Sequence, residues 1–169
     1  MMVLAMALAG ALVALGWVML LRRRLRESEE RFRHMALHDA LTGLATRLLL
    51  QDRLHVAIVS ARRHRTGLAV VIIDLDKFKS INDAFGHPAG DEVLKVTADR
   101  ISETVRSSGT VARLGGDEFV VLLSDIGDSR MVDAIGAQLV KNLARPVIFE
   151  GHEILVSASV GACVASLGG

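Results

Sequence analysis

The feature that most constrains this chain is the run Arg-Leu-Gly-Gly-Asp-Glu-Phe at residues 113–119, which has apolar residues on both sides. Glycine enters positive φ without steric cost, so Gly115-Gly116 predicts a two-residue turn between two β-strands. Asp117 and Glu118 then lie at the tip of a β-hairpin, where a ligand can reach them. Taken alone, the run is better explained as a solvated turn.

A second acidic cluster favours a functional site. Asp74 and Asp76 lie at the end of a β-branched run that predicts a buried strand. Residues two apart share one face of a strand, and paired carboxylates repel each other unless a cation joins them. Mg²⁺ accepts such oxygen ligands and usually keeps substrate phosphates in its coordination shell. If this strand lies beside the hairpin, Asp74, Asp117 and Glu118 converge on a metal–triphosphate site, and Lys79 supplies a cation for phosphate.

Composition limits the classes of partner. The chain has 169 residues, with 20 Lys and Arg against 19 Asp and Glu, and only 4% of its residues are aromatic. This length fits one ordinary domain with a short appendage. Because neither a basic excess nor a base-stacking surface is evident, polymeric nucleic acid is not an expected partner. The single Cys163 excludes an internal disulfide and is predicted to be a small buried hydrophobe.

The N-terminal segment predicts a membrane anchor. Residues 3–21 contain no charged residue and are followed directly by Arg22, Arg23 and Arg24. A helix of this length reaches roughly 28 Å, close to the ~30 Å hydrocarbon core of a bilayer. Positive charge after the apolar run favours an uncleaved anchor, predicting a single-pass protein of the inner membrane with its remaining chain in the cytoplasm. A buried core helix is the alternative.

The remaining chain alternates between helical and strand patterns. Residues 22–37 predict a helical stalk, for which a solvated linker helix is an equal alternative. Further helices are predicted at 46–64, 90–106 and 129–143, a strand at 68–74, and a second hairpin between 147–149 and 154–164. Helices alternating with a mixed, partly antiparallel sheet predict an α+β fold, that is, an α/β sandwich.

Four motifs together resemble the GGDEF family of diguanylate cyclases. They are His-Asp-Ala-Leu-Thr-Gly-Leu from His38, Asp-Leu-Asp-Lys-Phe-Lys-Ser-Ile-Asn-Asp from Asp74, Gly-His-Pro-Ala-Gly-Asp from Gly86, and the run at 113–119. The resemblance covers about residues 37–164, and the domain itself is predicted at 38–169. It implies a palm-like, nucleotide-cyclase-type fold, and condensation of two GTP into cyclic di-GMP and pyrophosphate at a homodimer interface.

The resemblance also implies roles for single residues. Asp74, the backbone carbonyl of Leu75 and Asp117 would bind Mg²⁺ or Mn²⁺, with Glu118 as a further ligand. Asp117 would also be the base for the ribose 3′-hydroxyl, which makes Asp117 and Glu118 the candidate catalytic residues.

The same comparison assigns substrate contacts outside the hairpin. Asn82 and Asp91 match the family's guanine contacts, and an amide with a carboxylate can pair with the O6 acceptor and the N1–H and N2–H₂ donors of guanine. A helix-terminal Asn and a helix cap are the alternatives. Lys79 is expected near phosphate, and His87 as a loop or ribose contact.

The chain departs from the family pattern at three places that bear on its expected function. The product-inhibition motif Arg-x-x-Asp has Gly109 in place of its acid, after Arg106. Thr46 replaces an Asn at a predicted helix start. The family's closing helix, which brings basic residues to the triphosphate, has no counterpart after the strand ending at Val164, so the domain is expected to be truncated at its C-terminus. The alternative function is a catalytically inactive GGDEF-like regulatory module that binds GTP or a protein partner.

Overall fold

A computed structural model of the chain describes residue 17 and residues 19–24, 36–106 and 109–166. The chain divides into two compact units, residues 1–36 and 37–169. In the first unit, residue 17 and residues 19–24 are helical. Most of the predicted anchor and of the predicted stalk lies outside the described residues, so the stalk stays a prediction.

The predicted membrane location is contradicted. Among the residues that the structure describes, no helix is both long enough and apolar enough to cross a bilayer. The physical reasons are length and charge, because a span needs about 20 apolar residues and charge is costly in the hydrocarbon region. The described helical residues 19–24 end in three arginines, and the longer helix at 47–64 carries Asp52 and Arg53 near its middle. We therefore withdraw the single-pass inner-membrane location and the membrane as a partner.

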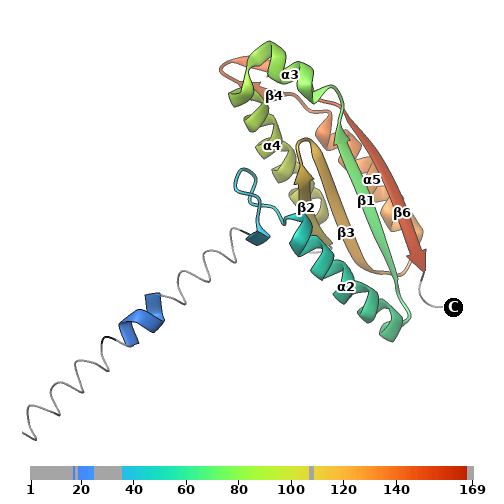
Figure 1. Cartoon of the computed structure of the whole chain (residues 1–169). Helices are drawn as coiled ribbons and strands as arrows, with labels where there is room; N and C mark the ends of the chain where they lie inside the picture. The colour runs from blue at the N-terminus through green and yellow to red at the C-terminus, as the bar shows by residue number, and fades with distance from the viewer. Residues whose placement is uncertain (1–16, 18, 25–35, 107–108, 167–169) are drawn as a thin grey trace, which may run out of the picture. The chain divides into compact units, whose positions relative to one another are not determined.

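A four-stranded sheet in the order β2-β3-β1-β6 forms the centre of the second unit (Figure 1). The strands are β1 Gly67–Leu75, β2 Gly109–Gly115, β3 Glu118–Ile126 and β6 Ala158–Ser166. All three neighbouring pairs are antiparallel, which corrects the predicted mixed sheet. The reason is that the hairpin inserts β3 between β1 and β2, so these two strands run in the same direction without pairing.

Among the described residues of this unit, four helices and a small second sheet accompany the main sheet. The helices are α2 Arg47–His64, α3 Phe78–Phe85, α4 His87–Val105 and α5 Ser129–Leu143, and β4 Val147–Phe149 pairs with β5 His152–Ile154. The predicted helices at 46–64 and 129–143 are confirmed. Helix α4 begins three residues before its predicted start, because Pro88 is well suited to the first turn of a helix. The predicted second hairpin is confirmed at its turn, where β4 pairs with β5 and Val147 lies opposite Ile154. Its second strand does not continue to Val164, because residues 158–166 form β6 and pair with β1.

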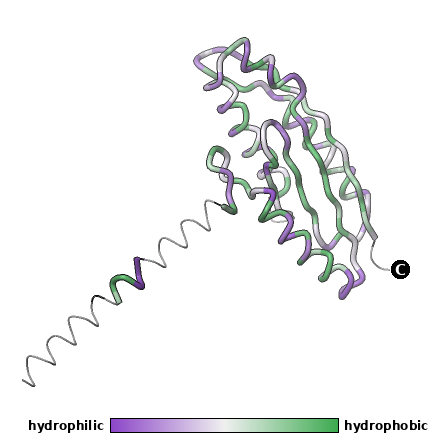
Figure 2. The backbone as a smooth tube through the Cα atoms, viewed as in Figure 1, coloured by the Kyte–Doolittle hydropathy of each residue, from purple (hydrophilic) through white to green (hydrophobic). Residues whose placement is uncertain are grey.

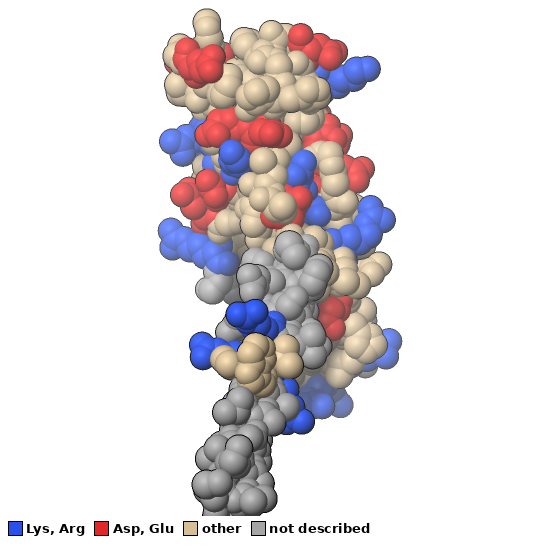
Figure 3. Space-filling model, turned by 60° about the vertical axis from the view of Figure 1, so that its left-hand side comes forward, with Lys and Arg blue, Asp and Glu red and all other residues tan. Residues whose placement is uncertain are grey.

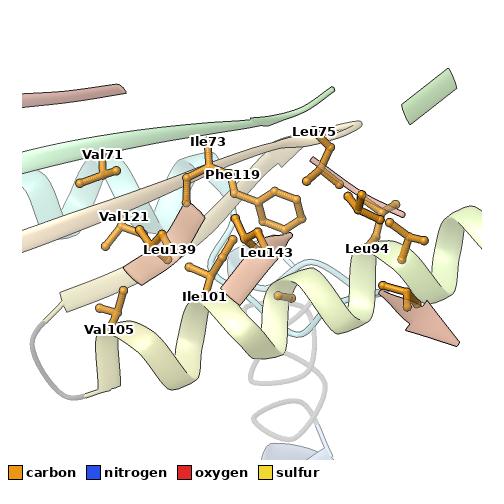
Figure 4. Packing of buried hydrophobic residues seen from close by; sticks show 14 of the residues in the cluster. Val71, Ile73, Leu75, Leu94, Ile101, Val105, Phe119, Val121, Leu139 and Leu143 are labelled. Atoms are coloured by element: carbon orange, nitrogen blue, oxygen red, sulfur yellow. The ribbon is translucent and has the colours of Figure 1, made fainter. Parts of the chain in front are cut away.

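One face of the sheet packs on helices α4 and α5. Alternate residues of β1 point to opposite faces of the sheet. The face toward α4 and α5 carries the buried residues Ala69, Val71, Ile73 and Leu75. Figure 4 shows Ile73 and Phe119 packed toward Ile101 of α4 and Leu143 of α5. Figure 2 shows hydrophobic stretches along the strands and alternating hydrophilic and hydrophobic residues along α2.

The opposite face is only partly covered. Ala57 and Ala61 of α2 pack on Leu68 and Leu122. Further along β1, the side chain of Ile72 is 56% exposed. The carboxyl end of β1 on this face is therefore open to solvent and to ligands.

Cys163 corrects a further prediction. It lies on β6, opposite Val70 of β1, and is exposed rather than buried. Strand β6 pairs only with β1 among the described strands, so it forms an edge of the sheet. An edge position exposes side chains that a central strand would bury.

Candidate active site

The β2–β3 hairpin places the acidic pair at its tip. Gly115 is the register partner of Glu118, so Gly116 and Asp117 form the turn, one residue later than predicted. Gly115 and Gly116 have φ values of 140° and 55°, a region that favours glycine. The pairing shifts between Arg113 and Gly115, as in a β-bulge, and bulges re-aim side chains near functional sites.

The end of β1 lies directly beside this hairpin, as predicted. Asp74 is the register partner of Glu118, and both residues are exposed. The backbone N–H of Leu75 donates to the carbonyl oxygen of Asp117, at 3.3 Å. Asp117 is half-buried. The structure therefore brings the backbone of Leu75 together with Asp74, Asp117 and Glu118 at one corner of the sheet.

These residues do not form a closed metal cage. Among the described residues, no group of three or more His, Cys, Asp and Glu side chains is gathered closely enough to hold a metal ion by itself. Mg²⁺ is usually bound by one or two carboxylates and completes its shell with water and substrate phosphates. The exposed carboxylates of Asp74 and Glu118 on neighbouring strands fit such an ion, which would bind together with a nucleotide.

Asp76 has a different environment from Asp74. Its carboxylate accepts hydrogen bonds from the hydroxyls of Ser157 and Ser159, each at 2.8 Å, and its N–H donates to the carbonyl oxygen of Ser157 at 2.9 Å. The hydrogen bond from the Ser157 hydroxyl, followed by that from Ser159, lowers the pKa of Asp76. Asp76 therefore joins the end of β1 to the start of β6, a structural role that the predicted pairing with Asp74 did not include.

The candidate guanine contacts lie where α3 meets α4. Asn82 is half-buried on α3 and Asp91 is exposed on α4, and Gly86, with φ 83°, lies between the two helices. The side-chain amide of Asn82 lies against Gly90, the residue before Asp91. Lys79 on α3 and His87 at the start of α4 are exposed, so a ligand can reach both side chains.

Arg113 is a site residue to which the sequence assigned no role. Its Nε and Nη2 atoms donate to the carbonyl oxygen of Gly116, at 2.9 and 2.7 Å, and its Nη1 donates to Oδ1 of Asp39, at 3.0 Å. Oδ1 of Asp39 also accepts from the N–H and the hydroxyl of Thr42, at 2.9 and 2.7 Å. The guanidinium thus connects the segment before α2 to the turn that carries Asp117.

The charge of Asp39 depends on this network. Partial burial raises its pKa, but hydrogen bonds from Thr42 and Arg113 outweigh this effect and hold the pKa below its ordinary value of 3.8. A carboxyl group with a lowered folded-state pKa stabilises the fold above its unfolded-state pKa. That stabilisation is lost as the pH falls through the lower, folded-state value.

Replacing Arg113 with Lys is expected to impair both the stability of the fold and the positioning of Asp117. Lys keeps the charge but cannot donate to Gly116 and Asp39 in the same forked geometry. We expect a loss of about 1–3 kcal/mol in the free energy of unfolding, measured by urea titration. Because the turn is then held less firmly, we also expect a reaction that depends on Asp117 to lose kcat more than its KM rises.

Arg130→Lys is the matched control for this variant. Arg130 and Asp128 form an exposed pair at the start of α5, and exposed pairs contribute little to stability. Equal effects of the Arg113 and Arg130 substitutions would contradict a positioning role for Arg113.

The chain belongs to the diguanylate cyclase family that carries the GGDEF domain. Residues 36–169 match the family described as "Diguanylate cyclase, GGDEF domain". The diguanylate cyclase TpbB of Pseudomonas aeruginosa is 40% identical over 139 residues, which cover 82% of this chain and 32% of TpbB. The bifunctional diguanylate cyclase/cyclic di-GMP phosphodiesterase MucR of the same species is 46% identical over 127 residues, covering 75% of this chain and 18% of MucR. The chain thus spans a third or less of the length of these relatives.

Solved structures agree with this assignment. The GGDEF domain of TpbB has a TM-score of 0.73 and 41% identity, over 75% of this chain and 74% of that one. The coiled coil and GGDEF domain of DgcB from Caulobacter crescentus, in complex with c-di-GMP, has a TM-score of 0.84 and 26% identity, over 93% of this chain and 84% of that one. The second unit therefore has the palm-like α+β fold of GGDEF domains, with an antiparallel sheet and flanking helices.

Proposed function

We propose that this chain is a diguanylate cyclase that condenses two GTP into cyclic di-GMP and releases two pyrophosphates. The observation that carries the proposal is the pairing of Asp74 with Glu118, together with the Leu75–Asp117 hydrogen bond, at the open end of β1. Family membership and the named diguanylate cyclases among the relatives support the same reaction.

The proposed chemistry uses the carboxylates of the hairpin. Asp117 accepts the proton of a ribose 3′-hydroxyl, and the resulting oxygen attacks the α-phosphate of the GTP held by a second subunit. One phosphodiester bond forms and one pyrophosphate leaves at each of the two attacks. Mg²⁺ or Mn²⁺, held by Asp74, Glu118, Asp117 and the Leu75 carbonyl, would neutralise charge on the phosphates.

The substrate contacts follow from the same proposal. Asn82 and Asp91 read the guanine base, because an amide and a carboxylate together match its acceptor and donor edge. Lys79 contributes positive charge near the phosphates, and His87 contacts the ribose or the loop around it. Figure 3 shows acidic and basic side chains interspersed over one face of the described residues, which suits a mononucleotide better than a polymeric nucleic acid.

Two subunits are needed for this reaction. Each subunit holds one GTP, so the two hairpins must face each other before a 3′-hydroxyl can reach the α-phosphate of the other nucleotide. The proposed active form is therefore a homodimer. Its rate of synthesis depends on the effective concentration of one GTP-bound subunit near the other.

Incubation with GTP and Mg²⁺, followed by detection of cyclic di-GMP by mass, tests this function. We expect product from the parent chain and none from Asp117→Asn. GTP that is bound without product formation would instead favour a regulatory module that binds nucleotide.

Product inhibition is expected to be weak in this chain. Gly109 stands where the family's inhibitory motif has an acid, and a Cβ added to Gly109 would overlap the carbonyl oxygen of Leu122 and lie 2.9 Å from Cδ2 of Leu123. Because β2 approaches β3 so closely, no carboxylate fits there without a backbone shift. The inhibition constant for cyclic di-GMP, measured from initial rates, should exceed about 1 μM, which corresponds to roughly −8 kcal/mol. A submicromolar value would contradict this expectation.

A further inference from the structure

Gly90 leaves a space that the side chain of Asn82 occupies. Gly90 is a buried residue in the first turns of α4. A Cβ added to Gly90 would overlap Oδ1 of Asn82, and would lie 3.0 Å from its Cγ and 3.2 Å from Cζ of Phe78. The amide of Asn82 therefore rests on the bare Cα of Gly90.

Helix stability does not explain this glycine. Glycine in a helix interior is less favourable than alanine because it loses more backbone freedom on folding. Gly136 of α5 shows the contrast, since nothing lies within 4 Å of a Cβ added there. At Gly90 the space is filled, and the atom nearest to the added Cβ belongs to the end of a side chain.

The identity of that nearest atom determines what a substitution does. Backbone next to an added Cβ would have to move as a unit, whereas Asn82 can relieve the overlap by rotating its side chain. The fold then survives, and the amide leaves its position on Gly90. Only the contact with Phe78 requires a small additional adjustment.

We infer that Gly90 is a specificity-determining residue, which selects guanine by holding the amide of Asn82 in place. This inference rests on the proposed function, in which Asn82 and Asp91 read the base. Gly90 precedes Asp91 on α4, so one short segment positions both groups. Guanine presents an O6 acceptor where adenine presents an amino group, and an amide held in one orientation distinguishes between them.

The test is a double-mutant cycle on the full chain. The proteins are the parent, Gly90→Ala, Asn82→Ala and the double variant, with Gly136→Ala as the matched control. Dissociation constants are measured with Mg²⁺ for a non-hydrolysable GTP analogue and for the corresponding ATP analogue. The thermal unfolding midpoint of each protein is measured in parallel.

We expect Gly90→Ala and Asn82→Ala each to raise the dissociation constant of the guanine analogue by roughly tenfold or more. The dissociation constant of the adenine analogue should change little. In the Asn82→Ala background, Gly90→Ala should change the dissociation constant of the guanine analogue by less than about twofold, because the amide on which Gly90 acts is then absent. Gly136→Ala should leave both constants unchanged. The unfolding midpoint of Gly90→Ala should stay close to that of the parent.

Several outcomes would overturn the inference. Guanine affinity in Gly90→Ala equal to that of the parent would show that the contact is irrelevant to binding. Equal weakening in both backgrounds, or failure of Gly90→Ala to fold, would show that Gly90 acts through the fold and not through Asn82. A parent that binds no guanine analogue would instead overturn the proposed function, and the specificity role with it.

Discussion

Replacing Asp74 with Asn is expected to lower the rate of cyclic di-GMP synthesis by roughly 10²–10³-fold. Asn has almost the same shape as Asp, and Asp74 is exposed at the end of β1, so the fold should be retained. What is lost is a negative charge beside Glu118, its register partner on β3. In the proposed function, that charge helps to hold a divalent cation on the triphosphate.

Initial rates measured over a series of Mg²⁺ concentrations check this prediction. The concentration of Mg²⁺ that gives half the maximal rate should rise in the variant. Asp125→Asn is the matched control, because Asp125 lies at the other end of β3, where it accepts a hydrogen bond from Thr66. An unchanged rate in Asp74→Asn, or an equal loss in the control, would show that Asp74 is not a metal ligand.

Replacing Phe119 with Ala is expected to cost about 3–5 kcal/mol of the free energy of unfolding. Phe119 is fully buried and packs in the main core between the sheet and helices α4 and α5 (Figure 4). A domain is typically stable by only about 5–15 kcal/mol, so the variant should be close to unfolding at physiological temperature. Because Phe119 follows Glu118, its loss also loosens the hairpin that carries the acidic pair.

Urea titration of the parent and of Phe119→Ala measures this loss directly. Ile148→Ala is a suitable control, because Ile148 is 60% exposed and exposed substitutions usually change stability by less than about 0.5 kcal/mol. A loss below about 1 kcal/mol in Phe119→Ala would contradict the assignment of Phe119 to the core.

Local patterns in the sequence were sufficient for the hairpin and for most helices. Two adjacent glycines between apolar runs, at residues 115 and 116, are typical of a hairpin turn. The period of apolar residues predicts α2 and α5. The convergence of Asp74 with Glu118 was also predicted, although only under the condition that β1 lies beside the hairpin. The structure confirms that condition.

Contacts between distant residues could not be predicted in the same way. Arg113 and Asp39 are 74 positions apart, and Asp76 is 81 positions from Ser157, so no local pattern links them. The pairing of β6 with β1 is equally non-local, and a run of small and β-branched residues does not specify its partner strand. For this reason the sequence pattern pairs residues 158–164 with the wrong strand and predicts a buried Cys163.

The contact between Gly90 and Asn82 could be predicted only in part. Both residues belong to motifs that the sequence identified, but their spacing does not show that the amide lies on the glycine. Only the packing of α3 against α4 shows why this helix position has no side chain.

The most direct test of the proposed cyclase is the ratio of its products. The chain is incubated with GTP and Mg²⁺, and pyrophosphate and cyclic di-GMP are quantified together over a range of protein concentrations. Two pyrophosphates for each cyclic di-GMP are expected, with a rate per subunit that rises with protein concentration until dimers are saturated. Release of GDP and phosphate, or GTP that stays bound without either product, would contradict the assignment of this chain as a diguanylate cyclase.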